Sequence, residues 1–248
     1  MEKKNKTIIV TGGSRGIGRS ISTRLAEAGY DLIITWRTSE RIAKETQQAI
    51  ECAGITCSLM QVDLEKTDLE ELFGDIDNRV TSPLYGLVNN AAHAGTRRPS
   101  NSISSADWRT TFEVNLFSVA ELCKLVFSHM SYGNGGAGGV IVNISSQVGQ
   151  YGGNGILPYA ASKSALNLLT VCLAREYGPS GVRVNAVSPG IIDSKDEEGR
   201  ALTPTEKITE IPLGRLGQPS DIAEAVLWLM SPSSSFVSGT VLPVHGAR

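Results

Sequence analysis

The sequence predicts an α/β fold in which one parallel β-sheet is covered by helices on both faces. Short apolar runs alternate with amphipathic stretches along nearly the whole chain, which is typical of strand–helix units in a parallel sheet. A glycine-rich turn follows the first apolar run directly. The 248 residues are 41% hydrophobic and 19% charged, an ordinary globular composition. We therefore expect a single domain, residues 1–248, with one large core.

The alternation assigns each element. Seven apolar runs are expected to be strands: 7–11, 31–36, 56–62, 85–89, 139–145, 182–187 and 240–244. Six amphipathic stretches are expected to be helices: about 16–28, 39–53, 67–80, 104–131, 158–177 and 219–230. A capping-box pattern opens two of the helices, at residues 67–70 and 104–107. The 158–177 stretch is apolar over a broad surface, which suggests burial against the sheet together with a subunit contact.

Two segments interrupt the alternation. Residues 132–139 read Y-G-N-G-G-A-G-G, and we interpret them as a flexible turn without chemistry. Residues 191–218 are polar, lack a strand and begin beyond a predicted strand end. Long loops in compact domains are usually functional, so this segment is predicted to be a lid over a substrate site. A plain surface excursion is the alternative.

Charge and composition exclude several classes of function. The net charge is −2 and no basic stretch indicates a nucleic-acid partner. No apolar run is long enough to span a membrane, and the polar start, residues 1–6, lacks the apolar region of a signal peptide. We expect a cytoplasmic protein without a membrane partner. The four cysteines and three histidines show no ligand spacing, so we expect reduced thiols and no metal.

The turn after the first strand has the composition of a phosphate-binding loop. Residues 11–18 read T-G-G-S-R-G-I-G, and glycines at 12, 16 and 18 permit a tight turn and close approach to a ligand. The helix that follows presents free N–H groups and a positive dipole end to a pyrophosphate. The spacing differs from G-x-G-x-x-G, and such a turn is also a purely structural solution. Its place at the first strand–helix junction nevertheless favours nucleotide binding.

The end of the second strand bears on the choice of cofactor. An acidic residue there would hold a ribose 2′-hydroxyl, but Trp36 occupies this end and Arg37 follows. Arg15 in the glycine loop can point to the same place. Two guanidiniums without a carboxylate suit a 2′-phosphate, so the sequence predicts NADP(H). The alternative is that both arginines are solvated surface charges.

Ser146, Tyr159 and Lys163 suggest the chemistry. Pro158 is suited to the first position of a helix, which places Tyr159 and Lys163 one turn apart on the same face. A neighbouring ammonium favours phenolate and would lower a phenol pKa that is normally about 10. Ser146, arriving from the preceding strand, can hold a substrate oxygen beside the phenol. This chemistry suits alcohol–ketone interconversion, although Y-x-x-x-K alone also occurs on many surface helices.

Together these segments resemble the classical short-chain dehydrogenase/reductase family across nearly the whole chain. The matching segments are T-G-G-S-R-G-I-G (11–18), V-D-L (62–64), N-N-A-A (89–92), E-V-N-L (113–116), N-I-S-S (143–146), Y-A-A-S-K (159–163) and S-P-G-I-I-D-S (188–194). Residues 211–226 are similar to the 3-oxoacyl-thioester (acyl-carrier-protein) reductase branch. The resemblance implies a single-domain Rossmann fold with a doubly wound seven-stranded parallel sheet, and a lid at about 191–218.

The resemblance also implies roles for individual residues. The residues that match the catalytic tetrad are Asn115, Ser146, Tyr159 and Lys163. Tyr159 would protonate the carbonyl oxygen, and Ser146 would hydrogen-bond it. Lys163 would bind the nicotinamide ribose and lower the phenol pKa, and Asn115 would hold a relay water.

Two further sets follow from the same resemblance. The implied cofactor-binding residues are Gly12, Ser14, Arg15, Gly16, Ile17, Gly18, Trp36, Arg37, Asp63, Leu64, Asn89, Ala91, Tyr159, Lys163, Pro189, Gly190, Ile192 and Ser194. The expected substrate-contacting residues are His93, Gln147, Tyr151 and Ile156. The resemblance implies no metal.

Three departures from the family pattern concern the cofactor and the partner. Ala92 replaces the glycine of N-N-A-G, and Ser194 replaces a threonine. Carrier-protein reductases usually have basic residues before the serine strand and after the tyrosine helix, where this chain has G-A-G-G (136–139) and G-P-S-G (178–181). The charges expected to dock an anionic carrier protein are therefore missing there. Arg97 and Arg98 are the nearest alternative basic pair.

We therefore predict an NADPH-dependent reductase of a ketone to a secondary alcohol, reversible as an alcohol dehydrogenase, that forms a homotetramer or homodimer. Its partner would be a small-molecule carbonyl or alcohol substrate, with a 3-oxoacyl thioester as one option. One alternative is a 3-oxoacyl-[acyl-carrier-protein] reductase of fatty acid synthesis. Another is a non-catalytic NADP(H)-sensing regulatory protein, against which the intact tetrad argues.

Overall fold

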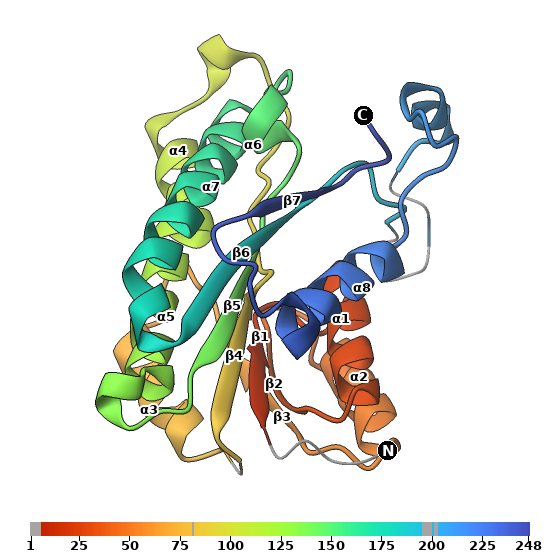
Figure 1. Ribbon diagram of the computed structural model, residues 1–248. Coiled ribbons are helices and arrows are strands. Elements are labelled where there is room, and N and C mark those ends of the chain that lie inside the picture. Colours follow the sequence, from red (N-terminus) through yellow and green to blue (C-terminus); the bar gives the residue numbers. More distant parts are fainter. Residues whose placement is uncertain (1–5, 81, 195–199, 201–202) are drawn as a thin grey trace.

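The computed structural model describes residues 6–80, 82–194, 200 and 203–248. A parallel sheet runs through its centre, with strands in the order β3-β2-β1-β4-β5-β6-β7 (Figure 1). The strands are β1 (Thr7–Val10), β2 (Asp31–Trp36), β3 (Cys57–Gln61), β4 (Leu84–Asn89), β5 (Gly139–Ile144), β6 (Val182–Pro189) and β7 (Val241–Val244). The chain moves outward from β1 to β3 and then returns to β4 beside β1. This reversal confirms the doubly wound fold and opens a crevice at the carboxyl ends of the strands.

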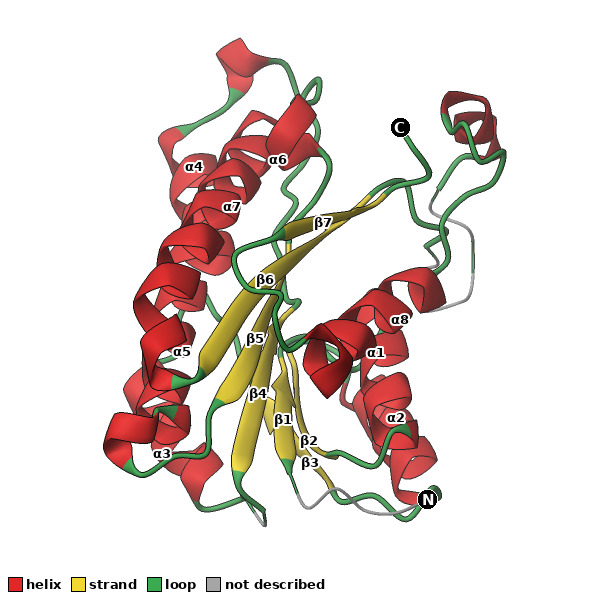
Figure 2. Cartoon of the chain, in the orientation of Figure 1, coloured by secondary structure: helices red, strands yellow, loops and turns green. Residues whose placement is uncertain are grey.

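Helices cover both faces of the sheet (Figure 2). On one face lie α1 (Gly16–Glu27), α2 (Glu40–Glu51) and α8 (Pro219–Met230). On the other lie α3 (Leu69–Asp77), α4 (Ser105–Phe112), α5 (Ser118–Met130) and α7 (Leu157–Tyr177). A single-turn helix, α6 (Val148–Tyr151), follows β5 at the carboxyl edge of the sheet. Four residues carry no periodicity that a sequence pattern can reveal, so α6 was not expected.

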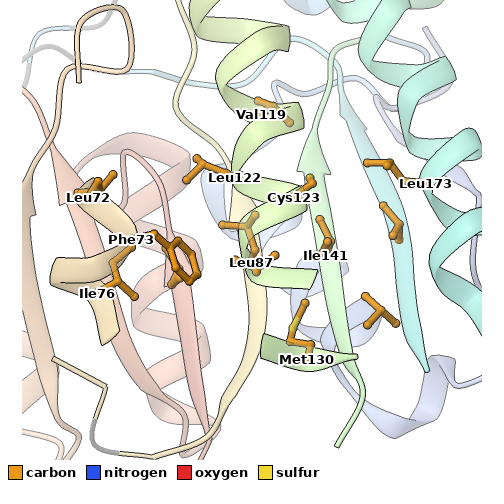
Figure 3. Close-up of a cluster of buried hydrophobic side chains, with 14 of the residues drawn as sticks. Leu72, Phe73, Ile76, Leu87, Val119, Leu122, Cys123, Met130, Ile141 and Leu173 are labelled. Carbon is orange, nitrogen blue, oxygen red and sulfur yellow. The ribbon is translucent and has the colours of Figure 1, made fainter. Parts of the chain in front are cut away.

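Each face has its own apolar core. Figure 3 shows the core beneath α3, α5 and α7, where Phe73, Leu122 and Ile141 interlock between helices and sheet. A second core fills the space between the sheet and α1, α2 and α8, with Ile8, Leu25 and Val226 among its members. All six residues of β5 are buried, as expected for a strand covered on both faces. The two cores fix the sheet and thereby the loops at its carboxyl edge.

The largest departure from the expected elements lies in the stretch 104–131. The predicted single helix is divided by a π-helical segment, Glu113–Phe117, between α4 and α5. A π-helical turn contains more residues than an α-helical turn, so it changes which side chains face inward and often marks a functional site. Here it directs Asn115 into the protein, where the residue is fully buried.

The two expected capping boxes have different outcomes. The box at the start of α4 is present, because Ser104 and Asp107 each bond the other's backbone N–H. At the start of α3 the prediction was wrong in its first residue. The cap is Asp68, whose carboxylate accepts from the N–H groups of Glu70 and Glu71 at 2.9 and 3.2 Å. Thr67 instead accepts a bond from the N–H of Asp63 at 3.2 Å.

The glycine-rich segment 132–139, interpreted as a flexible turn, is mostly exposed, but it is closely packed at its end, residues 138 and 139. It contains a short 3₁₀ helix, Tyr132–Asn134, and the N–H of Gly138 donates to the carbonyl of Met130 at 2.8 Å. A Cβ at Gly139 would lie 2.2 Å from the sulfur of Met130. These glycines are needed for close packing between α5 and β5.

The described residues also bear on the expectations for membrane spans, metal sites and cysteines. Within this part of the chain, no helix has both the length and the apolarity to cross a membrane, and no three His, Cys, Asp or Glu residues gather as metal ligands. All four cysteines are free. Burial raises the pKa of Cys57 and Cys123 to about 12, so both thiols stay protonated at neutral pH.

Candidate active site

The four predicted catalytic residues meet at the carboxyl edge of the sheet. Ser146 follows β5, Asn115 lies in the π-helical segment, and Tyr159 and Lys163 lie in the first turns of α7. Pro158 stands at the start of α7, as its fixed backbone angle favours. The buried Asn115 and Lys163 approach from the helical layer, while the partly exposed Ser146 and Tyr159 border the crevice.

The charges around Tyr159 differ from those expected. Burial raises the pKa of Tyr159 above its usual value, and its hydrogen bond with Ser146 offsets this only in part. The Nζ of Lys163 lies 5.8 Å from the centre of the phenol ring and donates to the carbonyl of Ile144 at 2.7 Å. The lowered phenol pKa that was expected is therefore not found in this structure, because burial is the largest influence on Tyr159 and Lys163 is not among the groups that shift it. Tyr159 is a protonated acid at neutral pH.

Lys163 is itself strongly affected by its surroundings. Burial lowers its pKa to about 8, because an ammonium group loses hydration inside the protein. Its bond to the Ile144 carbonyl, at the end of β5, holds the side chain in one direction. The lysine is thus charged at neutral pH and loses its charge within the mildly alkaline range.

Asn115 joins the loop after β4 to α7. Its Oδ1 accepts from the N–H of His93 at 2.8 Å, and its Nδ2 donates to the His93 carbonyl at 3.0 Å. The same Nδ2 donates to Ser162 Oγ at 2.9 Å, and that hydroxyl donates to the Tyr159 carbonyl at 2.8 Å. Both ends of the amide are therefore engaged in positioning the backbone around Tyr159. The relay-water role remains a prediction.

The glycine loop is held rigidly in place. Asn90 Nδ2 donates to the carbonyls of Thr11 and Gly12 at 2.9 and 3.1 Å, and the N–H of Gly12 donates to Thr35 Oγ1 at 3.0 Å. A Cβ at Gly18 would come 2.1 Å from the Gly12 carbonyl oxygen, so the loop and α1 touch directly. Asn90 was missed in the sequence. Its position at the end of the strand beside β1 was the available signal.

The start of α1 fits the diphosphate of a nucleotide. The helix begins at Gly16 without a side-chain cap and without an acidic residue in its first turn. A Cβ at Gly16 would meet no atom within 4 Å, so the approach to the helix end is open. Backbone N–H groups and a positive helix end bind anions in this geometry. The residues present therefore fit the dinucleotide that the resemblance implies.

A cavity of about 430 Å³ extends from this helix end. The glycine loop contributes Arg15, Gly16 and Ile17 to its wall, and the segment after β6 contributes Ile192 and Ser194. These predicted cofactor residues are therefore brought together. Ser14 is buried behind them, and its carbonyl accepts from Thr46 at 2.9 Å.

The segment that includes Ile192 and Ser194 is held by Thr203. Its hydroxyl lies 2.9 Å from that of Ser194 and donates to the Ile192 carbonyl at 2.8 Å. Of the expected lid, residues 195–199, 201 and 202 lie outside the described residues. The described part contains a 3₁₀ helix, Thr205–Glu210, and its ends meet where the N–H of Gly217 donates to the Ile191 carbonyl at 2.9 Å. A lid function remains a prediction.

Trp36, Arg37 and Asn89, three of the predicted cofactor residues, lie apart from this cavity. Trp36 lines a separate hollow at the β3 edge together with Lys44 and Arg79, while Arg37 is exposed beside it. The Asn89 side chain points into the protein, where Nδ2 donates to Asn143 at 2.9 Å. Its Oδ1 has no hydrogen-bond partner among the described residues. A cofactor contact at Asn89 would therefore have to use the backbone.

The predicted cofactor residues after β3, β4 and β6 lie at or just beyond the strand ends. Asp63 and Leu64 come just after β3, where the Asp63 carboxylate accepts from the N–H of Glu65 at 3.2 Å. The N–H of Ala91, after β4, donates to Thr11 Oγ1 at 3.0 Å. Pro189 ends β6, and the neighbouring Gly190 continues from it. These positions border the same carboxyl edge of the sheet.

The predicted substrate residues lie around Ser146 and Tyr159. Gln147 is only 6% exposed, and its Oε1 is buried without a hydrogen-bond partner among the described residues. Tyr151 ends α6 and is 62% exposed, and Ile156 precedes α7. His93 lies on the loop held by Asn115. Each borders the crevice from the α6–α7 side or from the loop after β4.

One neighbour of this group was missed in the sequence. The ring of His245, beyond the end of β7, meets the Tyr151 ring edge-on with their centres 6.2 Å apart. Its Nδ1 is buried and has no hydrogen-bond partner among the described residues. Only the tertiary structure brings the C-terminal segment to α6, so the sequence contained no signal for this contact.

The basic pair expected at the site mouth joins two loops. Arg97 donates to the Asn154 carbonyl, and the N–H of Arg98 donates to the Gly155 carbonyl at 2.9 Å. The Arg98 guanidinium lies 3.4 Å from the Asp107 carboxylate. Both arginines thus have intramolecular contacts, and they link the loop after β4 to the segment before α7.

Comparison with known proteins agrees with this geometry. Residues 12–246 match a family model described as enoyl-(acyl carrier protein) reductase. The chain is 35% identical to 3beta-hydroxysteroid dehydrogenase 1 of Eggerthella lenta, covering 98% of this chain and 93% of that protein. It is 36% identical to 3-oxoacyl-[acyl-carrier-protein] reductase FabG of Chlamydia trachomatis, covering 98% and 96%. The crystal structure of acetoin dehydrogenase YohF from Salmonella typhimurium superposes with a TM-score of 0.85 at 31% identity, covering 98% and 96%.

Proposed function

The chain belongs to the short-chain dehydrogenase/reductase family, whose members are oxidoreductases that use NAD(H) or NADP(H). On this basis we propose that it is an NADPH-dependent reductase of ketones, reversible as a dehydrogenase of secondary alcohols. One observation supports the proposal most strongly. A protonated phenol, Tyr159, lies beside Ser146 at the carboxyl edge of the sheet, near a loop that fits a dinucleotide.

The two hydroxyl groups would act on the substrate oxygen. When bound, the nicotinamide cofactor supplies the hydride for the carbonyl carbon. Tyr159 donates its phenolic proton to the carbonyl oxygen, and Ser146 holds that oxygen through its own hydroxyl. The raised pKa of Tyr159 keeps the proton in place until negative charge develops on the substrate. A fixed donor pair also stabilises the developing charge without reorganisation.

Lys163 and Asn115 would support this proton transfer. The Lys163 ammonium lies on the same helix face as the phenol and favours phenolate once Tyr159 has given up its proton. As the family resemblance implies, it would also bind the ribose hydroxyl groups of the cofactor. Asn115 keeps the backbone around Tyr159 in position through His93 and Ser162. Reprotonation of Tyr159 would pass along this side of the site.

The preference for NADPH rests on charge. Arg15 lines the cavity at the start of α1, and Arg37 follows β2 at the neighbouring strand end. An acidic residue that would repel a 2′-phosphate is absent from positions 35–37. Guanidinium groups bind phosphate in a forked geometry, so NADPH is favoured over NADH.

A second candidate function is reduction of a 3-oxoacyl group held by an acyl carrier protein. The similarity to the Chlamydia reductase over 98% of the chain favours it. Against it, the basic pair Arg97 and Arg98 is engaged in intramolecular contacts, and residues 136–139 and 178–181 contain no basic side chain. Small free carbonyl substrates therefore remain the preferred proposal.

Assembly and location complete the proposal. Phe117 and Leu168 expose 54% and 65% of their surface on the helical layer that contains α5 and α7. Exposed apolar side chains on this layer support pairing of two copies through it, as a homodimer or within a homotetramer. We propose a cytoplasmic location, in keeping with the four free cysteines, which suit a reducing compartment.

A substrate screen tests the proposed function. The purified protein is assayed for oxidation of NADPH and of NADH with short ketones, hydroxyketones, cyclic ketones, a 3-oxoacyl thioester and a 3-oxoacyl carrier protein. Ketone reduction with NADPH is expected. A strong preference for the carrier protein that weakens with salt and with Arg97→Glu/Arg98→Glu would favour the second function. Cofactor binding without turnover of any compound would contradict both.

A further inference from the structure

The strand ends opposite the glycine loop contain two enclosed polar atoms without partners. Gln147 Oε1 and His245 Nδ1 are both buried, and neither has a hydrogen-bond partner among the described residues. Buried polar atoms in native proteins are nearly always bonded, because leaving such a group without a hydrogen bond is energetically unfavourable. Two such atoms in one corner of the molecule indicate a place where a ligand supplies the missing groups.

Backbone contacts place both Gln147 and His245 on the side of the sheet where Ser146 lies. Gln147 directly follows Ser146, and its N–H donates to the Pro189 carbonyl at 2.9 Å. The next residue, Gly190, donates to the Val244 carbonyl at 3.0 Å. A Cβ at Gly190 would lie 2.6 Å from the Cα of His245. The ends of β5, β6 and β7 therefore lie side by side in the sheet. This arrangement brings His245 toward the side of the sheet where Ser146 lies.

Tyr151 lies between this corner and the solvent. Its N–H donates to the Gln147 carbonyl at 3.0 Å, and its ring meets the imidazole edge-on. Because 62% of Tyr151 is exposed, the ring forms the border between the corner and solvent. A ligand that enters beside Tyr151 and displaces its ring would reach the Gln147 amide and the imidazole together.

The C-terminal segment also leaves space for the rest of a ligand. His245 lines a cavity of about 570 Å³ that is walled by Ile191, Ile211 and Leu213. This size is within the range of small-molecule sites. Neither Ser146 nor Tyr159 lines the cavity. The cavity wall also contains the charged residues Arg215, Asp221 and Glu224. His245 therefore borders both this mixed cavity and the polar corner beside Tyr151.

From these contacts we propose that His245 and Gln147 form a second polar subsite, which selects carbonyl substrates bearing a hydroxyl or second carbonyl group close to the reacting carbonyl. The inference rests on the proposed ketone reduction and names its substrate class. An amide and an imidazole can each accept or donate, so together they satisfy a hydroxyl, which does both. The hydride and the Tyr159 proton go to the first carbonyl, and the second group stays unchanged.

Matched substrates test this subsite. With NADPH, kcat/KM is compared for butan-2-one, 3-hydroxybutan-2-one and 4-hydroxybutan-2-one. These ketones differ only in the presence or the position of one hydroxyl group. We expect at least one hydroxyketone to be preferred by tenfold or more, since a site built for a hydroxyl discriminates against an analogue that lacks it. His245→Phe and Gln147→Leu should each reduce that preference by about tenfold, the scale of one hydrogen bond.

Control variants show whether the loss of preference is specific to His245 and Gln147. They make the same substitutions at a histidine and a glutamine elsewhere in the protein. His129→Phe changes a histidine on α5 that contacts Ser128 and the ring of Phe73, and Gln150→Leu changes an exposed neighbour of Gln147 on α6. Both should keep the wild-type preference. Equal loss of activity toward all three ketones in His245→Phe and Gln147→Leu would show a structural role and overturn the proposal.

A binding measurement is independent of turnover. In the presence of NADP⁺, butane-2,3-diol should shift the imidazole nitrogen resonances of His245, while butan-2-ol should not; His245→Phe assigns the signals. If butan-2-one is reduced but no hydroxyl preference and no shift are found, the subsite is refuted and the proposed function stands. If no ketone is reduced but the diol shifts His245, the ketone reductase proposal fails and the subsite stands.

Discussion

The two halves of the crevice differ in how completely their polar groups are bonded. At the glycine loop, Asn90, Thr35 and Ser22 each bond the backbone of residues 11–13. At the ends of β5 and β7, Gln147 and His245 retain buried polar atoms without partners among the described residues. The first half is fixed before any ligand binds. In our proposal, a suitable ligand completes the bonding of the second half.

This difference follows from what each half has to recognise. A dinucleotide presents the same diphosphate every time, so a rigid set of backbone N–H groups is the best receptor. Substrates vary across the family, and the compared relatives include a hydroxysteroid dehydrogenase and an acyl-carrier-protein reductase. Variation is therefore expected in side chains such as Gln147 and His245, which lie outside the glycine loop.

The largest effect is expected where the two halves meet, at Tyr159. Tyr159→Phe removes the proton donor and keeps the ring, so turnover should fall by about a thousandfold or more. NADPH binding, measured by calorimetry, should be largely retained because the glycine loop is untouched. Tyr132→Phe, a distant exposed tyrosine, is the matched control and should be active. Near wild-type kcat in Tyr159→Phe would disprove the assignment.

A pair of glycine variants tests how rigid the first half is. In Gly18→Ala, the new methyl group would clash with the Gly12 carbonyl at 2.1 Å, which should cost about 3 kcal/mol of folding stability and weaken NADPH binding. Gly16→Ala meets no atom, and its φ of 54° should cost about 1 kcal/mol. Urea unfolding measures both. Equal stability losses would show that the loop can adjust.

Arg37 tests the charge at the phosphate end. The protein should prefer NADPH over NADH by more than about tenfold in kcat/KM, and Arg37→Asp should remove or invert that preference. Arg175→Asp, at the far end of α7, makes the same change of charge away from the site and should keep it. An equal kcat/KM for both cofactors in the unmodified protein would argue against the proposed NADP(H) specificity.

The smallest effect concerns pH. Lys163, with a pKa of about 8, is charged below that pH and neutral above it, whereas the Tyr159 pKa is raised and the phenol stays protonated there. Reduction should therefore be constant below about pH 7, fall to about half near pH 8 and decline severalfold by pH 9. In Lys163→Arg, the guanidinium remains charged, so any residual activity should lose this decline. A wild-type profile without it would remove Lys163 from the proton chemistry.

The sequence was sufficient for the elements that depend on local pattern. The strands end within two residues of their expected limits, because buried parallel strands appear as short apolar runs. The glycine loop, the start of α7 at Pro158 and the capping box at Ser104 depend on neighbours within a few residues. The same holds for the spacing of Tyr159 and Lys163, which one helical turn fixes.

Only the tertiary structure decided how distant groups affect one another. The Tyr159 pKa is raised because the phenol is buried, and the Lys163 ammonium is directed to the Ile144 carbonyl. The π-helical segment directs Asn115 toward His93 and Ser162. His245 reaches Tyr151 because β7 lies beside β6 and Gly190 has no side chain. Each depends on packing between segments far apart in the chain, which a local pattern does not encode.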